Sequence, residues 1–124
     1  MILLDTWAWI EYFNGTSKGS KVKETIEKTQ VYTSIISLAE ISKWVYKNEG
    51  NLGPIIKQIN VNSIVIDLEE EILIESGRQY NQIRKSKKEI GLIDVIIYTT
   101  ANIHSLKLLT GDPDFEGLEG VEML

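Results

Sequence analysis

Hydrophobic residues along this chain form short apolar runs that alternate with longer segments of helical periodicity. The runs predict buried strands at residues 2–4, 31–33, 64–66, 106–110 and 121–124. The intervening segments predict helices at residues 6–13, 22–29, 37–48, 51–59, 69–87 and 92–104. This alternation of strands and helices indicates an α/β fold with a short, mostly parallel sheet that is covered on both faces.

Length and composition set limits on this fold. With 124 residues and 43% hydrophobic positions, the chain is expected to form one domain, residues 1–124. It has no cysteine, which excludes disulfides and cysteine nucleophiles and agrees with a reducing, cytoplasmic location. The first residues show no basic region and no cleavage site, so we expect no signal peptide. The longest apolar stretch, near residues 90–103, is too short and too polar to cross a bilayer, so no membrane partner is expected.

Asp94 is the residue that folding alone explains least. It lies in the segment Gly-Leu-Ile-Asp-Val-Ile-Ile, residues 91–97, which is so apolar that every face of the predicted helix should be buried. A buried carboxylate is costly unless it is paired or holds a metal. We therefore expect Asp94 to have a cation, a basic partner or a raised pKa.

Three further acidic residues follow apolar segments and are candidates for the same site. Asp5 ends the first predicted strand, Asp112 follows the fourth, and Glu40 follows Leu-Ala within the helix at residues 37–48. Sites in open parallel sheets form beyond the carboxyl ends of the strands, so Asp5 and Asp112 are expected on one rim. We predict that these three residues and Asp94 meet at one divalent-metal site.

Each of the three also has an explanation that requires no chemistry. Asp5 could cap the helix that follows it. Glu40 shares a helical stripe with Lys43 and Lys47, so a surface ion pair would account for it. Asp112 precedes a proline, and Asp-Pro is common in turns. The joint pattern therefore carries more weight than any single member.

The available ligand types narrow the choice of metal. The chain has no cysteine and one histidine, so the common zinc sites are hard to assemble. A group of carboxylates completed by water suits Mg²⁺ or Mn²⁺. Such ions lower the pKa of a bound water and stabilise the leaving oxygen in phosphodiester cleavage. The acidic residues therefore predict a metal-dependent nuclease.

The distribution of the other charges leaves two interpretations open. The net charge of −5 is unusual for a nucleic-acid-binding protein. The segment Asp67-Leu68-Glu69-Glu70 is typical of a capping box and needs no catalysis. A basic cluster precedes Asp94 and is either a solvated helix end or a set of contacts to RNA phosphates. Its members are Arg84, Lys85, Lys87 and Lys88.

Four motifs give the chain a resemblance to a known family. In order they are Ile-Leu-Leu-Asp5-Thr6, Leu-Ala-Glu40-Ile, Leu-Ile-Asp94-Val-Ile-Ile and Leu-Leu-Thr110-Gly-Asp112-Pro-Asp114-Phe115. These motifs resemble the ordered acidic motifs of PIN domains, and the chain is similar to the small stand-alone members known as VapC-type toxins. The resemblance extends from the first predicted strand to the last.

The resemblance implies a three-layer α/β/α fold and Mg²⁺- or Mn²⁺-dependent endoribonuclease activity. By position, Asp5, Glu40, Asp94 and Asp112 correspond to the acidic set of the family. Asp114 corresponds to an accessory acid, Thr110 to a hydroxyl that orients neighbouring carboxylates, and Thr6 to the hydroxyl residue after the first aspartate. Similar toxins are usually homodimers and bind an antitoxin that often places a basic side chain in the acidic pocket.

Our hypothesis is cleavage of single-stranded RNA by a metal-activated water that leaves a 3′ hydroxyl. Asp5, Asp94 and Asp112 would hold the metal, while Glu40 would position or deprotonate the water. One alternative is an interaction module whose acidic pocket only receives a basic segment of a partner. Another is a phosphatase with Asp5 as its nucleophile, although Trp7 occupies the position where such enzymes need a second acid.

Overall fold

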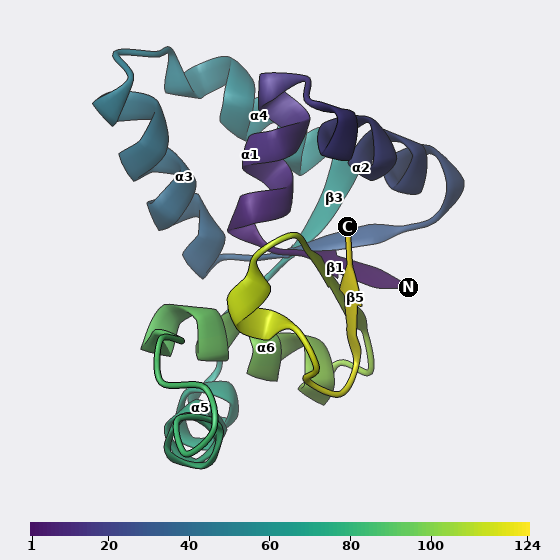
Figure 1. Ribbon diagram of the computed structural model, residues 1–124. Coiled ribbons are helices and arrows are strands. Elements are labelled where there is room, and N and C mark those ends of the chain that lie inside the picture. Colours follow the sequence, from purple (N-terminus) through teal and green to yellow (C-terminus); the bar gives the residue numbers. More distant parts are fainter.

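A parallel sheet of five strands runs through the middle of the computed structural model, which describes residues 1–124 (Figure 1). The strands are β1 (Ile2–Leu4), β2 (Val31–Ser34), β3 (Ser63–Ile66), β4 (Lys107–Thr110) and β5 (Val121–Met123). Their order across the sheet is β3-β2-β1-β4-β5, and every neighbouring pair is parallel. The chain builds outward from β1 to β3 and then returns to the other side of β1. The direction of winding therefore changes between β1 and β4, where α/β sheets commonly form their sites.

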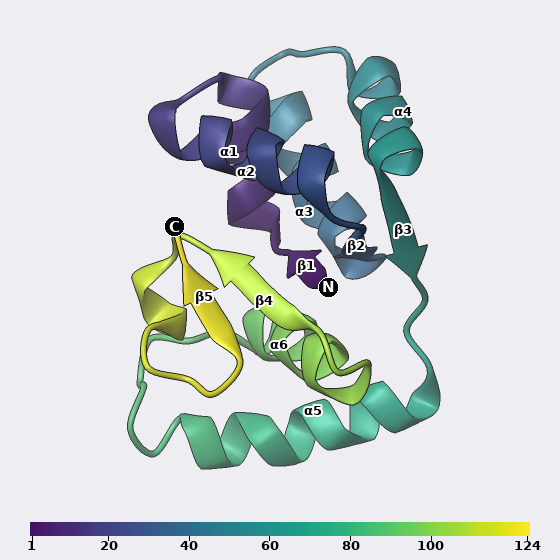
Figure 2. The same cartoon turned by 90° about the vertical axis from the view of Figure 1, so that its right-hand side faces the viewer.

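Helices cover both faces of this sheet (Figures 1 and 2). On one face lie α1 (Thr6–Asn14), α2 (Ser17–Lys28), α3 (Ile36–Lys47) and α4 (Leu52–Asn62). On the other lie α5 (Glu70–Ile83) and α6 (Leu92–Ile103), and the short 3₁₀ helix η1 (Pro113–Phe115) leads from β4 towards β5. This arrangement confirms the predicted three-layer α/β/α fold in a single domain. None of the helices combines the length and apolar character needed to cross a bilayer.

Alternation along β1 divides the buried residues between the two faces. Ile2 and Leu4 pack in one hydrophobic cluster with the fully buried Trp9 of α1. Leu3 points to the opposite face and packs in a second cluster with Phe115. Side chains of successive strand residues point to opposite faces, so this three-residue strand contributes to both layers. Because β1 is the central strand, the connection from β1 to α1 lies at the middle of the sheet edge.

Two helix boundaries differ from the sequence predictions by four or more residues. α2 begins at Ser17, five residues before the predicted start, because the Thr16 side chain accepts a hydrogen bond from the Gly19 N–H (3.0 Å) and caps the helix. α5 ends at Ile83, and residues 84–88 form turns that follow it. The predicted capping box at the start of α5 is wrong, because Glu69 is the N-cap residue and no side chain accepts a bond there.

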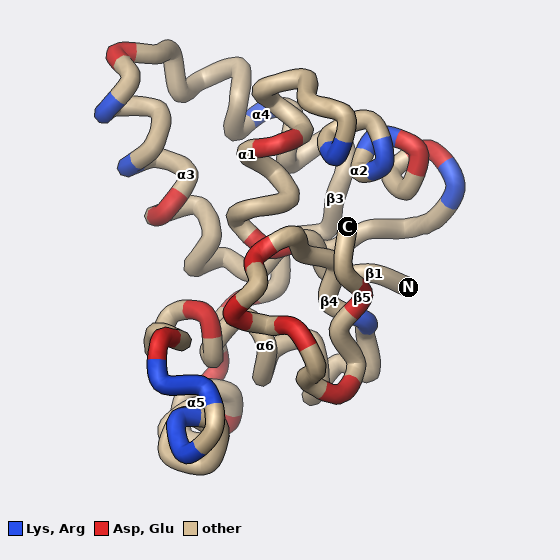
Figure 3. The backbone as a smooth tube through the Cα atoms, viewed as in Figure 1, with Lys and Arg blue, Asp and Glu red and all other residues tan.

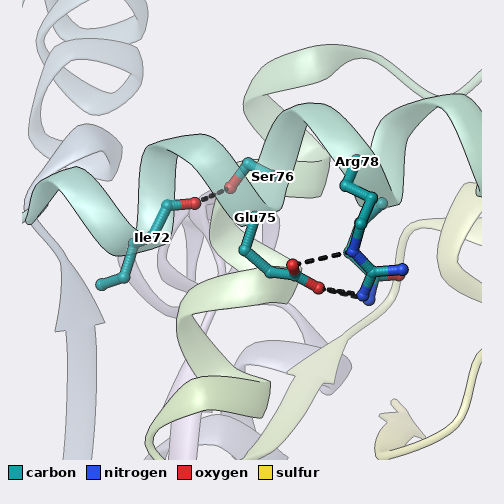
Figure 4. Close-up of polar contacts among 5 residues, drawn as sticks. Ile72, Glu75, Ser76 and Arg78 are labelled. Atoms are coloured by element: carbon teal, nitrogen blue, oxygen red, sulfur yellow. Dashed lines mark hydrogen bonds and ion pairs between the residues drawn. The ribbon is translucent and has the colours of Figure 1, made fainter.

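The polar contacts drawn in Figure 4 join residues of one helix, α5. Ser76 donates a hydrogen bond to the carbonyl oxygen of Ile72 (2.6 Å), and Glu75 forms an ion pair with Arg78. The pKa of Glu75 is lowered because its carboxylate accepts hydrogen bonds from Arg78 and Gln79. This surface pair is the only salt bridge in the protein. No other acidic side chain is therefore neutralised by direct ion pairing.

The close approach of α1 and α2 depends on Gly19. A Cβ atom at this position would collide with the backbone carbonyl of Glu11 and approach the Cα of Tyr12. We expect Gly19→Ala to lower the free energy of unfolding by about 2 kcal/mol, in the range of overpacked cores. Urea denaturation measures this change. Gly77→Ala on α5 is the matched control, because nothing lies within 4 Å of the added methyl group and alanine favours a helix. Equal stability of the two variants would contradict the predicted helix contact.

Candidate metal centre

The carboxyl ends of β1 and β4 open into a cavity of about 180 Å³. All four predicted acidic residues, Asp5, Glu40, Asp94 and Asp112, line it. Asp5 directly follows β1, and Asp112 lies two residues beyond β4, while Glu40 comes from α3 and Asp94 from the first turn of α6. Residues that are up to 107 positions apart in the sequence therefore face one space, which is large enough for an ion with several waters.

Asp5 lines this cavity, is almost fully buried and accepts two hydrogen bonds. Its Oδ1 accepts a hydrogen bond from the Ala8 N–H (2.8 Å), so Asp5 also caps α1, as its position after β1 allowed. Its Oδ2 accepts a hydrogen bond from the hydroxyl of Thr110 (2.5 Å), the last residue of β4. Asp5 therefore caps α1 and also belongs to the acidic group that lines the cavity.

The Thr110 hydroxyl connects Asp5 to the turn that carries the other aspartates. It accepts a hydrogen bond from the Asp112 N–H (3.0 Å) while it donates to Asp5. Asp112 in turn accepts a hydrogen bond from the Asp114 N–H (2.9 Å). Thr110 has 0% exposure, so neither bond competes with water. This geometry agrees with the orienting role that the family resemblance implies for Thr110.

Asp94 stands at the start of α6, less deeply buried than predicted. The apolar pattern predicted burial on every face of this helix, which is wrong for Leu92 and Ile93, because these residues are 50% and 40% exposed. The Asp94 side chain accepts a hydrogen bond from the Gly91 N–H (3.2 Å) and closes the first turn. The carboxylate thus has a structural role and also faces the cavity.

Burial and mutual repulsion raise the pKa values of two cavity carboxylates. Burial raises the pKa of Asp5 from 3.8 to about 7, against the opposing effect of its hydrogen bonds from Thr110 and Ala8. Burial also raises the pKa of Asp94 from 3.8 to about 6, and the charges of Asp112 and Glu40 add to this increase. The negative charge of the cavity is therefore uncompensated within the protein itself.

Glu40 is fixed by a threonine and not by a lysine. One of its oxygens accepts a hydrogen bond from the Thr6 hydroxyl (2.6 Å), which joins α3 to the first turn of α1. No ion pair with Lys43 or Lys47 exists, so the surface-pair explanation for Glu40 does not hold. The second carboxylate oxygen has no hydrogen-bond donor from the protein and remains available to a water in the cavity.

The carboxylates that converge most closely are Asp94, Asp112 and Asp114. Each offers one oxygen, and these oxygens lie within 4.8 Å of one another. Such an all-oxygen set with room for water fits Mg²⁺ or Mn²⁺ and lacks the ligands of a zinc site. This group differs in one member from the predicted ligands Asp5, Asp94 and Asp112. The sequence did not show that the η1 turn brings Asp114 close to Asp94.

No lysine or arginine lines the cavity or forms an ion pair with these acids. Figure 3 shows acidic positions along the η1 segment and at the start of α6, and basic positions on α2, on α3 and in the turns between α5 and α6. Arg84 donates hydrogen bonds to the Tyr80 hydroxyl (2.9 Å) and to the Ile90 carbonyl (3.0 Å), so it secures the turns after α5. The cavity is lined by none of the four residues of the predicted basic cluster, and their contact with phosphates stays a prediction.

The hydrogen bond from Thr110 allows a test of the electrostatics of the site. We expect Thr110→Val to raise the pKa of Asp5 further, because this bond is the largest effect that opposes its burial. Carbon-detected NMR titration of the aspartate carboxyl groups measures the change. We also expect unfolding to become easier by about 1–2 kcal/mol, since Asp5 and the Asp112 N–H lose a buried partner.

A matched control is available on α6. Thr100 is also fully buried, and its hydroxyl donates only to the Ile96 carbonyl within the helix. Thr100→Val should leave the pKa of Asp5 unchanged. An Asp5 titration that is the same in Thr110→Val as in the unsubstituted protein would show that Thr110 does not control this carboxylate.

Comparison with known proteins agrees with the class of fold. The model of the PIN domain family matches residues 2–121, and the chain belongs to this family. No curated protein sequence matches the chain. A toxin–antitoxin complex from Klebsiella pneumoniae contains a chain that is 26% identical, with a TM-score of 0.76 and coverage of 99% of this chain and 97% of that one.

Two further structures show the same fold at lower identity. VapBC2 from Rickettsia felis, bound to a promoter DNA fragment, has 18% identity, a TM-score of 0.75 and coverage of 100% of this chain and 98% of that chain. VapC20 from Mycobacterium tuberculosis, a toxin that cleaves the sarcin–ricin loop, has 15% identity, a TM-score of 0.75 and coverage of 96% and 95%. The resemblance to PIN domains of the VapC type is thereby confirmed.

Proposed function

We propose that this protein is a Mg²⁺- or Mn²⁺-dependent endoribonuclease that cleaves single-stranded RNA and acts as the toxin of a toxin–antitoxin pair. The observation that carries the proposal is the group of Asp94, Asp112 and Asp114 oxygens within 4.8 Å of one another at the rim of the cavity. No basic side chain neutralises them. Such a group is costly to the fold, and a dication would offset that cost.

The residues of the cavity have separable tasks in this proposal. Asp94, Asp112 and Asp114 would hold the dication, and Asp5, whose two oxygens each keep a free lone pair, faces the same space. When bound, the ion lowers the pKa of a water and neutralises charge on the leaving oxygen. Glu40, fixed by Thr6 through one oxygen, would orient the attacking water and accept its proton with the other.

The proposed partner is an antitoxin with a basic segment. The Klebsiella pneumoniae neighbour is a toxin–antitoxin complex, and the Rickettsia felis neighbour is a VapBC assembly on DNA. In this chain, a cavity lined by four carboxylates suits an arginine or lysine side chain, which would compete with the dication for the same oxygens. We also propose a homodimer, on the basis of the family resemblance alone.

The phosphatase alternative is disfavoured by the surroundings of Asp5. Its side chain is 3% exposed, and both of its oxygens accept hydrogen bonds from within the protein. A carboxylate nucleophile must move towards phosphorus, and the near-complete burial of Asp5 together with a hydrogen bond to each oxygen opposes that movement.

Cleavage mapping on total RNA tests the proposal directly. We expect internal cuts with 3′ hydroxyl ends in Mg²⁺ or Mn²⁺, and none when EDTA removes the ions. Mapping by sequencing of the new ends also yields the preferred sequence. Absence of cleavage in every divalent ion, combined with no heat on titration of Mn²⁺ in a calorimeter, would instead support the interaction module.

A further inference from the structure

The side chain of Trp7 lies on the wall of the acidic cavity and is not part of the core. It lines the cavity together with Ile10 and the four acids, and it is only partly buried. Neither hydrophobic cluster includes it, in contrast to Trp9, which is fully buried. Trp9 also donates its indole N–H to Thr33 (3.0 Å), whereas the Trp7 N–H has no partner in the protein. Packing of the core therefore does not explain a tryptophan at position 7.

The backbone keeps space free for this large ring. Gly111 connects Thr110 to Asp112, and a Cβ atom at Gly111 would collide with the six-membered ring of Trp7. The indole thus rests directly on the turn that carries Asp112. A ring fixed in this place lies beside the position where a phosphodiester would meet the aspartates.

A lysine from the next helix lies over the Trp7 ring. The Nζ of Lys18, in the first turn of α2, is 5.2 Å from the ring centroid. Lys18 is exposed and forms no salt bridge, so the ring face is the only partner of its ammonium group within the protein. Figure 3 shows further basic positions along α2, on the α1 side of the sheet. A cation and an aromatic face therefore adjoin a cavity that is otherwise acidic.

We propose that Trp7 and Lys18 form the nucleotide-binding wall of the cavity, where a base of single-stranded RNA stacks on the indole and Lys18 contacts the adjoining phosphate. This inference rests on the proposed nuclease function. Stacking of a base on an aromatic ring is stronger than an exposed cation–π contact, so a base displaces the lysine from the ring face. The released ammonium group can then pair with the backbone phosphate next to that base. The wall offers the contact to RNA that the net charge of −5 does not supply.

Binding of a fluorescein-labelled single-stranded RNA tests the wall separately from catalysis. The parent protein is Asp94→Asn, which keeps the RNA intact, and affinity is measured by fluorescence anisotropy. We expect Trp7→Leu to weaken binding by roughly 5- to 100-fold, because leucine fills the space beside Gly111 but provides no ring for stacking. Trp7→Phe should restore most of the affinity, and Lys18→Ala should weaken binding and reduce its salt dependence. Lys57→Ala, an exposed lysine of α4, is the matched charge control and should bind like the parent.

Tryptophan fluorescence adds a readout that a purely structural role would not change. RNA without a label should quench emission of the parent, and Trp7→Phe should lose most of this quenching while it still binds. Equal affinity of the parent and Trp7→Leu, or equal quenching in the parent and Trp7→Phe, would overturn the proposal that a base stacks on Trp7. If the wild-type protein cleaves RNA and the wall variants bind normally, only this inference fails. If the wild-type protein neither cleaves nor binds RNA, the proposed function fails as well.

Discussion

Replacing Asp94 with asparagine is expected to reduce Mg²⁺- or Mn²⁺-dependent RNA cleavage by at least about 100-fold while the fold stays intact. The carboxylate is one of three whose oxygens converge within 4.8 Å, and loss of its charge weakens the hold on a dication that supplies several kcal/mol to the reaction. Initial rates on a defined single-stranded RNA, measured across a series of Mn²⁺ concentrations, give both the rate and the metal requirement.

The asparagine variant is informative because it preserves the local structure. The amide oxygen of asparagine can accept the hydrogen bond from the Gly91 N–H, so α6 keeps its first turn. Removal of one negative charge also relieves repulsion from Asp112 and Glu40, and the melting temperature without metal should stay equal or rise. Asp67→Asn, an exposed aspartate outside the cavity, is the control and should retain full activity. Undiminished cleavage by Asp94→Asn would exclude the assigned role of Asp94.

The sequence predicted the fold well because its strands are short and apolar and its helices are periodic. All five strands and six helices exist near their predicted positions, since a parallel sheet buried on both faces imposes that pattern. Positions after strands also predicted that Asp5 and Asp112 would lie at the same edge of the sheet, because the carboxyl ends of β1 and β4 are neighbours. The order of strands and helices in the sequence therefore predicts which residues lie at this edge of the sheet.

Side-chain directions beyond the strand ends could not be derived in the same way. The hydrogen bond from Thr110 to Asp5 and the return of Asp114 towards Asp94 depend on the path of Gly111 and η1, which periodicity does not describe. The same holds for Trp7, because helical periodicity does not show that its ring contacts Gly111 and lies outside both hydrophobic clusters. These features arise from loop geometry and from contacts between elements distant in the chain.

In the absence of metal, the free energy of unfolding is expected to decrease as the pH rises from 5 to 7.5. The folded-state pKa values of Asp5 and Asp94 are about 7 and about 6, above the 3.8 of an exposed aspartate, so the folded protein binds more protons than the unfolded chain in this window. Linkage then requires stability that is fully present below pH 4 and is lost as the pH passes through these raised values. For Asp5 the full loss corresponds to roughly 4 kcal/mol, of which the window above pH 5 contains the larger part. Glu75 has a lowered pKa, so its contribution to stability changes with pH in the opposite direction. That change occurs mainly below pH 5.

A dication should oppose this trend, because it binds the ionised carboxylates of the folded state only. Urea denaturation in EDTA and in Mg²⁺, at several pH values, measures both effects. At 100 times its dissociation constant the ion stabilises the fold by about 2.7 kcal/mol, and this gain should be larger at pH 7.5 than at pH 5, where protons compete for Asp94. Asp94→Asn should flatten the slope in EDTA and lose most of the gain in Mg²⁺, whereas Asp67→Asn should change neither. Stability that increases with pH in EDTA would mean that these carboxylates have a cationic partner within the protein, and the requirement for a metal to offset their charge would disappear.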